Sequence, residues 1–411
     1  MKIKFYRLNI IEIFIFFFMI IFILMGLLKR FYSNYFGYTD ELLMMFLILI
    51  YIGNVLINKK IKVKKETKKI ILGYFTLLLI GLAGNLISKA QIDKYAIVID
   101  FFSWLKFFGV IAIIDSLITN DNLEKYYYYL IKLCKFSIVY GFVIYILTFF
   151  NIIEFDNTVR YGVLALTIGG HPSFSCALYA LCASVLICDY KKNIIWILLS
   201  VILCLLTLRS KAFGFIAMLL VLIIIFNRKL KIKNILIAGI VVLAISWKPI
   251  SFYYLNSQAS RAVLLNTSFK IAKDYFPFGS GFGTFGTIMS SYHYSNIYID
   301  YGLSNRYGFS KAYSDWVGDG GFASIIGQFG YIGISIFISF FINFVKIIKL
   351  KVLSKNKKYY LPICLLIGYI LISSTNESFF NSDISMLFAI SIVVLSKILN
   401  IKYERENDIC E

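Results

Sequence analysis

Charged residues are scarce in this chain, and acidic residues are scarcer than basic ones. Only 16% of its 411 residues are Asp, Glu, Lys or Arg, whereas soluble domains typically contain about 25%. Hydrophobic residues make up 60% of the chain, which excludes an ordinary soluble globular protein. The chain has 42 basic and 22 acidic residues. In a soluble protein this excess would suggest a nucleic-acid partner, but in a membrane protein it follows from the positive-inside rule.

Apolar runs recur along the whole sequence, at about the 17 to 25 residues that a helix needs to cross a bilayer. Because a helix satisfies its own backbone hydrogen bonds, the sequence predicts an all-α polytopic membrane protein with about twelve transmembrane helices. The first run is followed by Lys29 and Arg30 rather than by a small-residue cleavage site, so we expect it to be an uncleaved span. The expected spans are 8–28, 41–57, 70–87, 97–118, 133–153, 172–188, 193–208, 210–226, 234–252, 321–345, 360–375 and 384–399.

Basic segments predict the orientation. Three basic runs, at 58–69 and beginning at Asn227 and Lys346, are expected on the cytoplasmic side, which also places both termini in the cytoplasm. Under this topology two thirds of the 42 Lys and Arg residues fall on the inner side, while most Asp and Glu residues fall elsewhere. We therefore expect a multi-pass protein of the cytoplasmic (inner) membrane, with lipid headgroups rather than nucleic acid as the partner of its basic runs.

One polar segment interrupts the apolar pattern. Residues 253–320 are rich in Tyr, Ser, Asn and Gly and fall outside the membrane. Loops of this length are frequently functional. Its early part has a helical period that ends at Pro277, since proline disfavours helix in the residue before it. With no long-period repeat, the sequence predicts a single transmembrane domain, 1–411, that contains one large extracytoplasmic loop.

No disulfide is expected to stabilise that loop. Six of the seven cysteines lie in or beside expected membrane helices and Cys410 lies in the tail, so the external segments have no disulfide framework. The loop's many tyrosines, together with Trp316, suit a sugar-binding surface, because aromatic faces stack on sugar C–H groups. They also suit an aromatic belt at the membrane interface.

A glycine-rich stretch, PFGSGFGTFG, occupies residues 277–286. Gly281, Gly283 and Gly286 match the G-x-G-x-x-G spacing, but a dinucleotide turn needs a preceding strand and a following helix, and the sequence predicts neither here. Two interpretations remain. The glycines, with Gly279, form a turn that lets the loop fold back on the membrane surface, or their backbone N–H groups approach a phosphate or sugar ligand closely.

Several short motifs together resemble the O-antigen polymerase and O-antigen ligase family. They are Arg261 with IAKDYFPFGSGFGTF at 271–285, LTLRSKAFGFIAMLL at 206–220, GFASIIGQFGYIGISIF at 321–337, RYGVLALTIGGHPSF at 160–174 and DELLMMFLILIYI at 40–52. The resemblance implies a GT-C-like glycosyltransferase whose donor is a polyprenyl-pyrophosphate-linked oligosaccharide. Such a donor is already activated, so no cofactor and no metal are expected, and the sequence has no D-x-D motif.

The implied donor needs cations, because its pyrophosphate leaving group is strongly anionic. Arginine holds such groups through two parallel hydrogen bonds. The candidates are Arg209 and Lys211 in a short outer turn, Arg261 at the start of the loop helix, and Arg160. Each has a simpler interpretation as a helix-end charge near the headgroups, a solvated charge or a member of a local ion pair.

A base is needed to take the proton of the attacking hydroxyl. Histidine titrates near neutral pH, and the chain has only two, His171 and His293, both mapped outside and both candidate catalytic residues. Other candidate bases are Asp315, Asp319 and Glu377, although Asp319 precedes the expected span 321–345, and the sequence favours a helix-capping role for it over catalysis. The expected span 97–118 contains Asp100, Lys106 and Asp115; charges inside a membrane are often functional, but these are not expected to be catalytic.

The resemblance implies a polymerase that joins repeat units of an O-antigen, capsule or exopolysaccharide with inversion at the anomeric carbon. Its implied partners are the flippase and the chain-length regulator of the same pathway. The nearest alternative is a ligase that transfers the finished chain to another acceptor. A flippase for the lipid-linked unit is a third, although such transporters usually have two related halves, and this sequence has no detectable halves. A non-catalytic scaffold would tolerate the loss of Arg209 and Arg261.

Overall fold

A computed structural model describes residues 10–31, 39–58, 65–153, 159–160, 162–168, 171–227, 251, 256–348 and 360–410. In these ranges the protein is helical apart from turns and one two-stranded hairpin, so the all-α prediction is confirmed in its coarse form. The helices are α1 (Ile10–Phe31), α2 (Thr39–Asn58), α3 (Lys65–Ser88), α4 (Lys94–Leu105), α5 (Phe108–Leu117), α6 (Asn120–Phe149), α7 (Pro172–Leu186), α8 (Tyr190–Leu206), α9 (Ser210–Asn227), α11 (Ser260–Asp274), α12 (Ile288–Tyr292), α13 (Ile297–Asp300), α14 (Gly321–Ile348), α15 (Leu361–Asn376) and α16 (Ile384–Cys410), and the hairpin is β1 (Val159–Arg160) with β2 (Val163–Leu164).

The lengths and apolar composition of the helices indicate a multi-pass membrane protein. Within the described ranges, six helical segments are long and apolar enough to cross a membrane, or seven if the bent pair α4–α5 is one span. This is fewer than the expected twelve. The apolar parts of α9 and α15 are shorter than a full span, and the expected span 234–252 lies outside the described residues. The number twelve therefore stays a prediction.

One of the six segments, Pro172–Leu206, is a helical hairpin. Its two arms, α7 and α8, are separated by a 3-10 turn at Ile187–Asp189 and lie side by side. The Ser200 hydroxyl donates to the Tyr179 carbonyl at 2.8 Å, and the sulfur atoms of Cys176 and Cys204 are 3.8 Å apart. Two antiparallel helices therefore occupy the positions of the two spans expected at 172–188 and 193–208.

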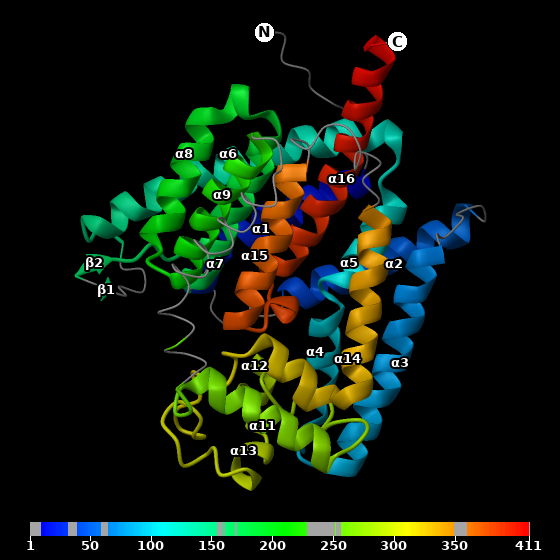
Figure 1. Ribbon diagram of the computed structural model, residues 1–411, viewed down its shortest axis with the longest axis vertical. Coiled ribbons are helices and arrows are strands. Elements are labelled where there is room, and N and C mark those ends of the chain that lie inside the picture. The colour runs from blue at the N-terminus through cyan, green and yellow to red at the C-terminus, as the bar shows by residue number, and fades with distance from the viewer. Residues whose placement is uncertain are drawn as a thin grey trace.

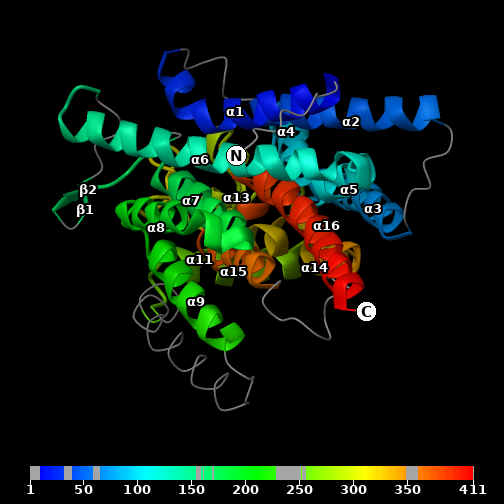
Figure 2. The same cartoon turned by 90° about the horizontal axis from the view of Figure 1, so that it is seen from above.

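Helices α6, α8, α9, α15 and α16 pack around α7, and α11–α13 collect at one end of the molecule. Helix α7 contacts α6, α8, α15 and α16, and nearly all its residues are buried. Figure 2 shows α1 and α2 along one side of the molecule and α9 on the opposite side. Helices α11, α12 and α13 lie at the end away from the C-terminus (Figure 1). These helices and their connections, residues 256–320, are called the cap below, and they enclose their own buried cluster, which includes Leu264 and Phe309.

The expected single span 97–118 is wrong in shape, because it is broken. Helices α4 and α5 are separated at Lys106 and Phe107, and their axes differ by 51°. The break carries the buried Lys106 ammonium to Asp40 and to Glu41, whose Oε1 is 2.8 Å from Nζ. A buried charge must be paired. Hydropathy alone could not reveal this pairing, since Asp40 and Glu41 belong to another helix.

The glycine-rich stretch joins the cap to the membrane helices. Gly279, Gly281 and Gly283 have φ angles of +73°, +93° and +67°, which favour glycine. The N–H of Gly281 donates to the Gln328 carbonyl at 2.8 Å, and the N–H of Gly283 donates to Asp100 Oδ2 at 2.8 Å. These donors are bonded inside the protein, which favours the fold-back turn over a ligand-binding loop.

Candidate functional site

A polar cavity of about 660 Å³ lies between the cap and the ends of α7, α9 and α15. Its walls come from segments that are far apart in the sequence and that were all expected on the outer side of the membrane. Its cationic side chains are Arg160, Arg209, Lys211 and Arg261. Its acidic side chains are Asp315, Asp319 and Glu377. All four cations predicted for the pyrophosphate therefore line the same cavity, where a strongly anionic group could bind.

Arg209 follows α8 in a tight turn in which Leu208 has a φ of +52°. Burial, and then the neighbouring Arg160 guanidinium, lower the pKa of Arg209. Within the described part of the chain, no carboxylate lies within ion-pair distance of Arg209 or Arg160. Two guanidinium groups that repel each other and lack direct acidic partners create a positive potential, which a phosphate group would relieve.

His171 contacts Arg209 directly. It is the N-cap residue of α7, where its Nδ1 accepts from the Ser173 N–H at 3.2 Å, and its Nε2 is 2.6 Å from Arg209 Nη2. Burial, and then the Arg209 charge, lower the pKa of His171 to about 4. At neutral pH the ring is therefore neutral and a weak base. A catalytic role was expected for His171. The geometry instead favours a role in which His171 positions the Arg209 side chain.

Lys211 is neutralised by Glu377. The Lys211 Nζ lies 2.5 Å from Glu377 Oε1, and the Ser373 hydroxyl donates to the same oxygen at 2.7 Å. Burial by itself would raise the pKa of Glu377, but the Lys211 ammonium and these hydrogen bonds outweigh it and lower the pKa to about 2. Glu377 is therefore a poor proton acceptor, and the pair fixes α9 against α15 at the cavity wall.

Asp319 is a carboxylate whose surroundings suit it to accept a proton. It lies just before α14 and lines the cavity. Burial raises the pKa of Asp319 to about 6, because the nearby Arg261 guanidinium opposes the rise only in part. A base is most effective when its pKa lies near the working pH. The pKa of Asp319 therefore suits this role better than that of Glu377.

Arg261 lies in the first turn of α11, next to Ala259 and Ser260 in the cavity wall. The N-terminus of a helix has unpaired backbone N–H groups and a positive dipole end, both of which favour an anion. Arg261 and this helix end therefore present positive charge to the same space.

His293 lies elsewhere and does not line the cavity. Its Nδ1 is 2.6 Å from Asp93 Oδ2, and its carbonyl accepts from the Gln91 side chain at 2.8 Å. These contacts join the end of α12 to the loop between α3 and α4. The expectation that His293 shares a catalytic site with the arginines is corrected, because the cap folds so that this side chain faces Asp93 instead.

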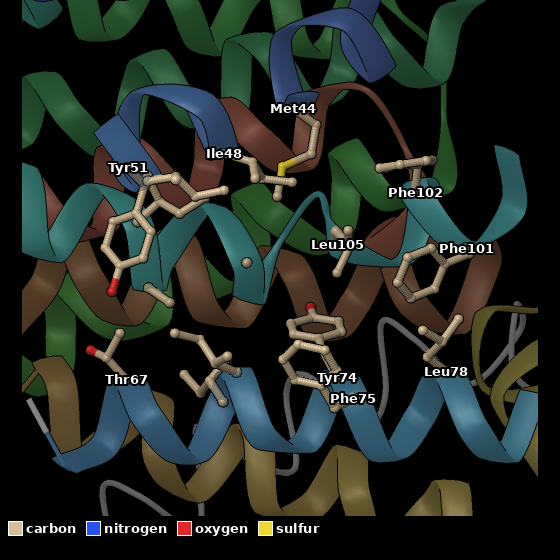
Figure 3. A pocket seen from close by; sticks show the side chains of 16 residues that line it. Met44, Ile48, Tyr51, Thr67, Tyr74, Phe75, Leu78, Phe101, Phe102 and Leu105 are labelled. Carbon is tan, nitrogen blue, oxygen red and sulfur yellow. The ribbon is translucent and has the colours of Figure 1, made fainter. Parts of the chain in front are cut away.

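A second cavity, of about 410 Å³, lies among α2, α3, α4 and α5 (Figure 3). Its lining is apolar except for the hydroxyls of Tyr51, Thr67 and Tyr74. The Tyr74 hydroxyl is already bonded to the Trp104 carbonyl at 3.0 Å. Among the described residues that line this cavity there is no carboxylate, histidine or cation. The charged cavity is therefore the better candidate for binding an anion or moving a proton.

Some polar residues that line the charged cavity were not predicted from the sequence. Ser173, Ser210 and Asn376 belong to this group. The available signal was their position, because they lie next to or two residues from His171, Arg209 and Glu377, respectively, and adjacent residues at helix ends face the same loop region.

No protein-family model matches this sequence, and no curated protein is significantly similar to it. The resemblance to the O-antigen polymerase and ligase family therefore rests on the short motifs alone.

Proposed function

We propose that this protein is a glycosyltransferase that polymerises polyprenyl-pyrophosphate-linked oligosaccharide repeat units on the outer face of the cytoplasmic membrane. One observation carries the proposal: the four cations expected to bind pyrophosphate line one cavity beneath the cap. The proposal includes a GT-C-like fold with twelve spans and both termini in the cytoplasm. The flippase and the chain-length regulator of the same pathway would be its partners.

The cavity offers two kinds of anion contact for the donor's pyrophosphate. Arg160 and Arg209 supply guanidinium groups from one side, and Arg261 with the N-terminus of α11 supplies positive charge from the other. These groups stabilise the pyrophosphate more strongly as it leaves, since its negative charge increases when the glycosidic bond breaks. His171 keeps the Arg209 side chain directed into the cavity.

The reaction is a single displacement. A hydroxyl oxygen of the acceptor repeat unit forms a bond to the anomeric carbon of the donor chain. The bond from that carbon to the pyrophosphate oxygen breaks, and its electron pair leaves with the polyprenyl pyrophosphate. Asp319 accepts the hydroxyl proton, for which its raised pKa suits it. Attack from the side opposite the leaving group inverts the anomeric centre.

The test is the length distribution of surface polysaccharide from a deletion strain that carries wild type, Arg209→Ala or Arg261→Ala at matched membrane levels. The proposal expects a ladder from wild type and single repeat units from both variants. Lys270→Ala is the matched control, because Lys270 is an exposed cation on α11 that does not line the cavity.

Other outcomes would separate the alternatives. Long chains that remain on the lipid carrier would support the ligase instead, because polymerisation would then be intact. Repeat units trapped on the cytoplasmic side would support a flippase. Wild-type ladders from both variants would overturn the assignment of this cavity to pyrophosphate.

A further inference from the structure

Three exposed aromatic rings cluster on the surface of the cap. Tyr307, Tyr313 and Trp316 are called the aromatic platform. The ring centroids of Tyr307 and Tyr313 are 4.7 Å apart, and those of Tyr307 and Trp316 are 5.1 Å apart. The three residues are 67%, 42% and 38% exposed, respectively. Contiguous apolar surface that is left open to solvent commonly marks a binding site.

The platform is held rigidly from behind. The N–H of Trp316 donates to the Gly308 carbonyl at 3.0 Å. Gly308 has a φ of +82°, and a Cβ at this position would collide with the indole ring, so glycine is needed for the backbone to lie against Trp316. The ring of the buried Phe309 lies nearly perpendicular to the indole ring, at a centroid distance of 6.3 Å. A ligand would therefore meet a surface that is already in place, which reduces the entropy lost on binding.

The platform is continuous with the charged cavity. Trp316 belongs to both, and its neighbour Asp315 also lines the cavity. The N–H of Asp319 donates to the Trp316 carbonyl at 3.1 Å, so the proposed base follows the platform by a single turn. A ligand that stacks on Trp316 would extend to the mouth of the charged cavity. In the proposed reaction, the acceptor hydroxyl must reach this place.

We propose that the aromatic platform binds a sugar ring of the acceptor oligosaccharide. A sugar ring has an apolar face of C–H groups and an edge of hydroxyls. The platform offers matching aromatic faces and tyrosine hydroxyls. Aromatic residues of this kind also occur at membrane interfaces, but Trp316 opens onto a cavity wall with Asp315 and Asp319, which suits hydroxyl groups better than acyl chains. The inference rests on the proposed function, which supplies an oligosaccharide as the acceptor.

The experiment measures binding without turnover, using the full-length protein in nanodiscs. The probe is the repeat-unit oligosaccharide that mild acid releases from its lipid carrier in a strain deleted for this protein. Tryptophan fluorescence is recorded during titration, and the signal of Trp316 is obtained as the difference between wild type and Trp316→Phe. We expect a saturable change in wild type that is absent from Trp316→Phe.

Variants locate the binding site. Loss of one stacking ring should weaken binding about tenfold. Trp316→Leu is therefore expected to raise the dissociation constant about tenfold, measured by saturation-transfer NMR, and Trp316→Phe should recover most of the loss. Tyr307→Leu is a second platform variant. Because the Tyr307 ring is mostly exposed, this substitution should leave folding unaffected. Phe276→Leu is the matched control, because Phe276 is an exposed cap aromatic that lies next to Tyr331 of α14 and does not line the cavity.

Each outcome decides the inference separately from the proposed function. Unchanged binding in both Tyr307→Leu and Trp316→Leu, or no binding by wild type, would overturn it. Quenching of Trp316 by brominated lipids, without any response to the oligosaccharide, would assign the platform to the membrane surface and would also overturn it. If Arg209→Ala and Arg261→Ala give normal polysaccharide ladders while the platform variants lose the oligosaccharide, the proposed function fails and the platform remains a sugar site.

Discussion

Asp100 in α4 accepts a hydrogen bond from the backbone N–H of Gly283 in the cap, at 2.8 Å from Oδ2 to N. The same carboxylate oxygen accepts from the Gln328 side chain of α14 at 3.0 Å. One buried side chain therefore ties the cap to two membrane helices. This contact holds the glycine-rich stretch, which follows α11 in the chain, against the membrane helices.

Removing this contact should loosen the cap. We expect Asp100→Ala to destabilise the protein by about 1 to 3 kcal/mol, because a buried N–H and a buried amide lose their acceptor. Limited proteolysis in detergent should then cut within residues 253–320 sooner than in wild type. Asp100→Asn keeps an acceptor oxygen and is the matched comparison. Equal cleavage rates for wild type and Asp100→Ala would show that Asp100 does not anchor the cap.

The Lys211–Glu377 pair gives a second prediction, on stability. Glu377→Gln leaves a buried ammonium without its counter-charge, which costs about 3 to 5 kcal/mol in comparable cases. We expect a lower melting temperature in detergent and less protein in the membrane. The double variant Lys211→Met/Glu377→Gln should recover part of the loss, since the two effects couple. Additive losses in the double variant would mean that the two side chains do not interact.

Asp319 predicts how activity depends on pH. The proposed role as base requires an ionised carboxylate, and burial raises the pKa of Asp319 to about 6. Transfer should therefore fall about tenfold for each pH unit below about 6. Asp319→Asn should lose transfer at all pH values, and Asp319→Glu should keep part of it. The measurement is chain formation in vitro from purified lipid-linked repeat units. A profile that stays flat down to about pH 4.5, well below that pKa, would exclude Asp319 as the base.

The same residue should make stability depend on pH with a defined sign. A carboxyl whose pKa is raised on folding favours the fold when it is protonated. Its stabilising contribution is fully present below its ordinary pKa of 3.8 and is lost as the pH rises through about 6. We expect Asp319→Asn to remove this part of the pH dependence. Between about pH 5 and about pH 7.5, the melting temperature should therefore fall further for wild type than for the variant. The same loss in both proteins would contradict the raised pKa.

The cluster around Lys106 gives a prediction for the break between α4 and α5. Lys106→Met leaves Asp40 and Glu41 buried without a cation, and we expect a loss of about 3 to 5 kcal/mol, measured by thermal unfolding in detergent. Neutralising both acids in the same chain should restore part of this loss. Lys270→Met, on the exposed face of α11, is the control. A Lys106→Met protein as stable as wild type would show that the acids are solvated.

The sequence predicted the helical membrane class and the cations of the cavity, but not the route of every helix. Apolar periodicity is a local property, so the α7–α8 hairpin followed from the pattern. The break at Lys106 depends on carboxylates from α2, and no local pattern contains that information. His293 could not be placed for a similar reason, because its position depends on how the cap folds against Asp93.

Electrostatics also explains why the choice of base could not come from residue types. His171 has the pKa best suited to neutral pH as a free side chain, but burial and Arg209 lower it in the cavity. The pKa of Asp319 moves in the opposite direction, because its carboxyl is buried and lies near Glu377. Both residues were candidates from the sequence, and only their surroundings separate them.

The hydrogen bonds from α3, α4 and α14 to the glycine-rich stretch limit which parts of the chain can change independently. Asn85, Asp100 and Gln328 bind this stretch from three separate helices. A loop exchanged between proteins of this architecture would therefore have to bring matching helices with it. Substitutions at Tyr307 and Trp316, on the outer surface of the cap, should change what the cap binds without disturbing those contacts.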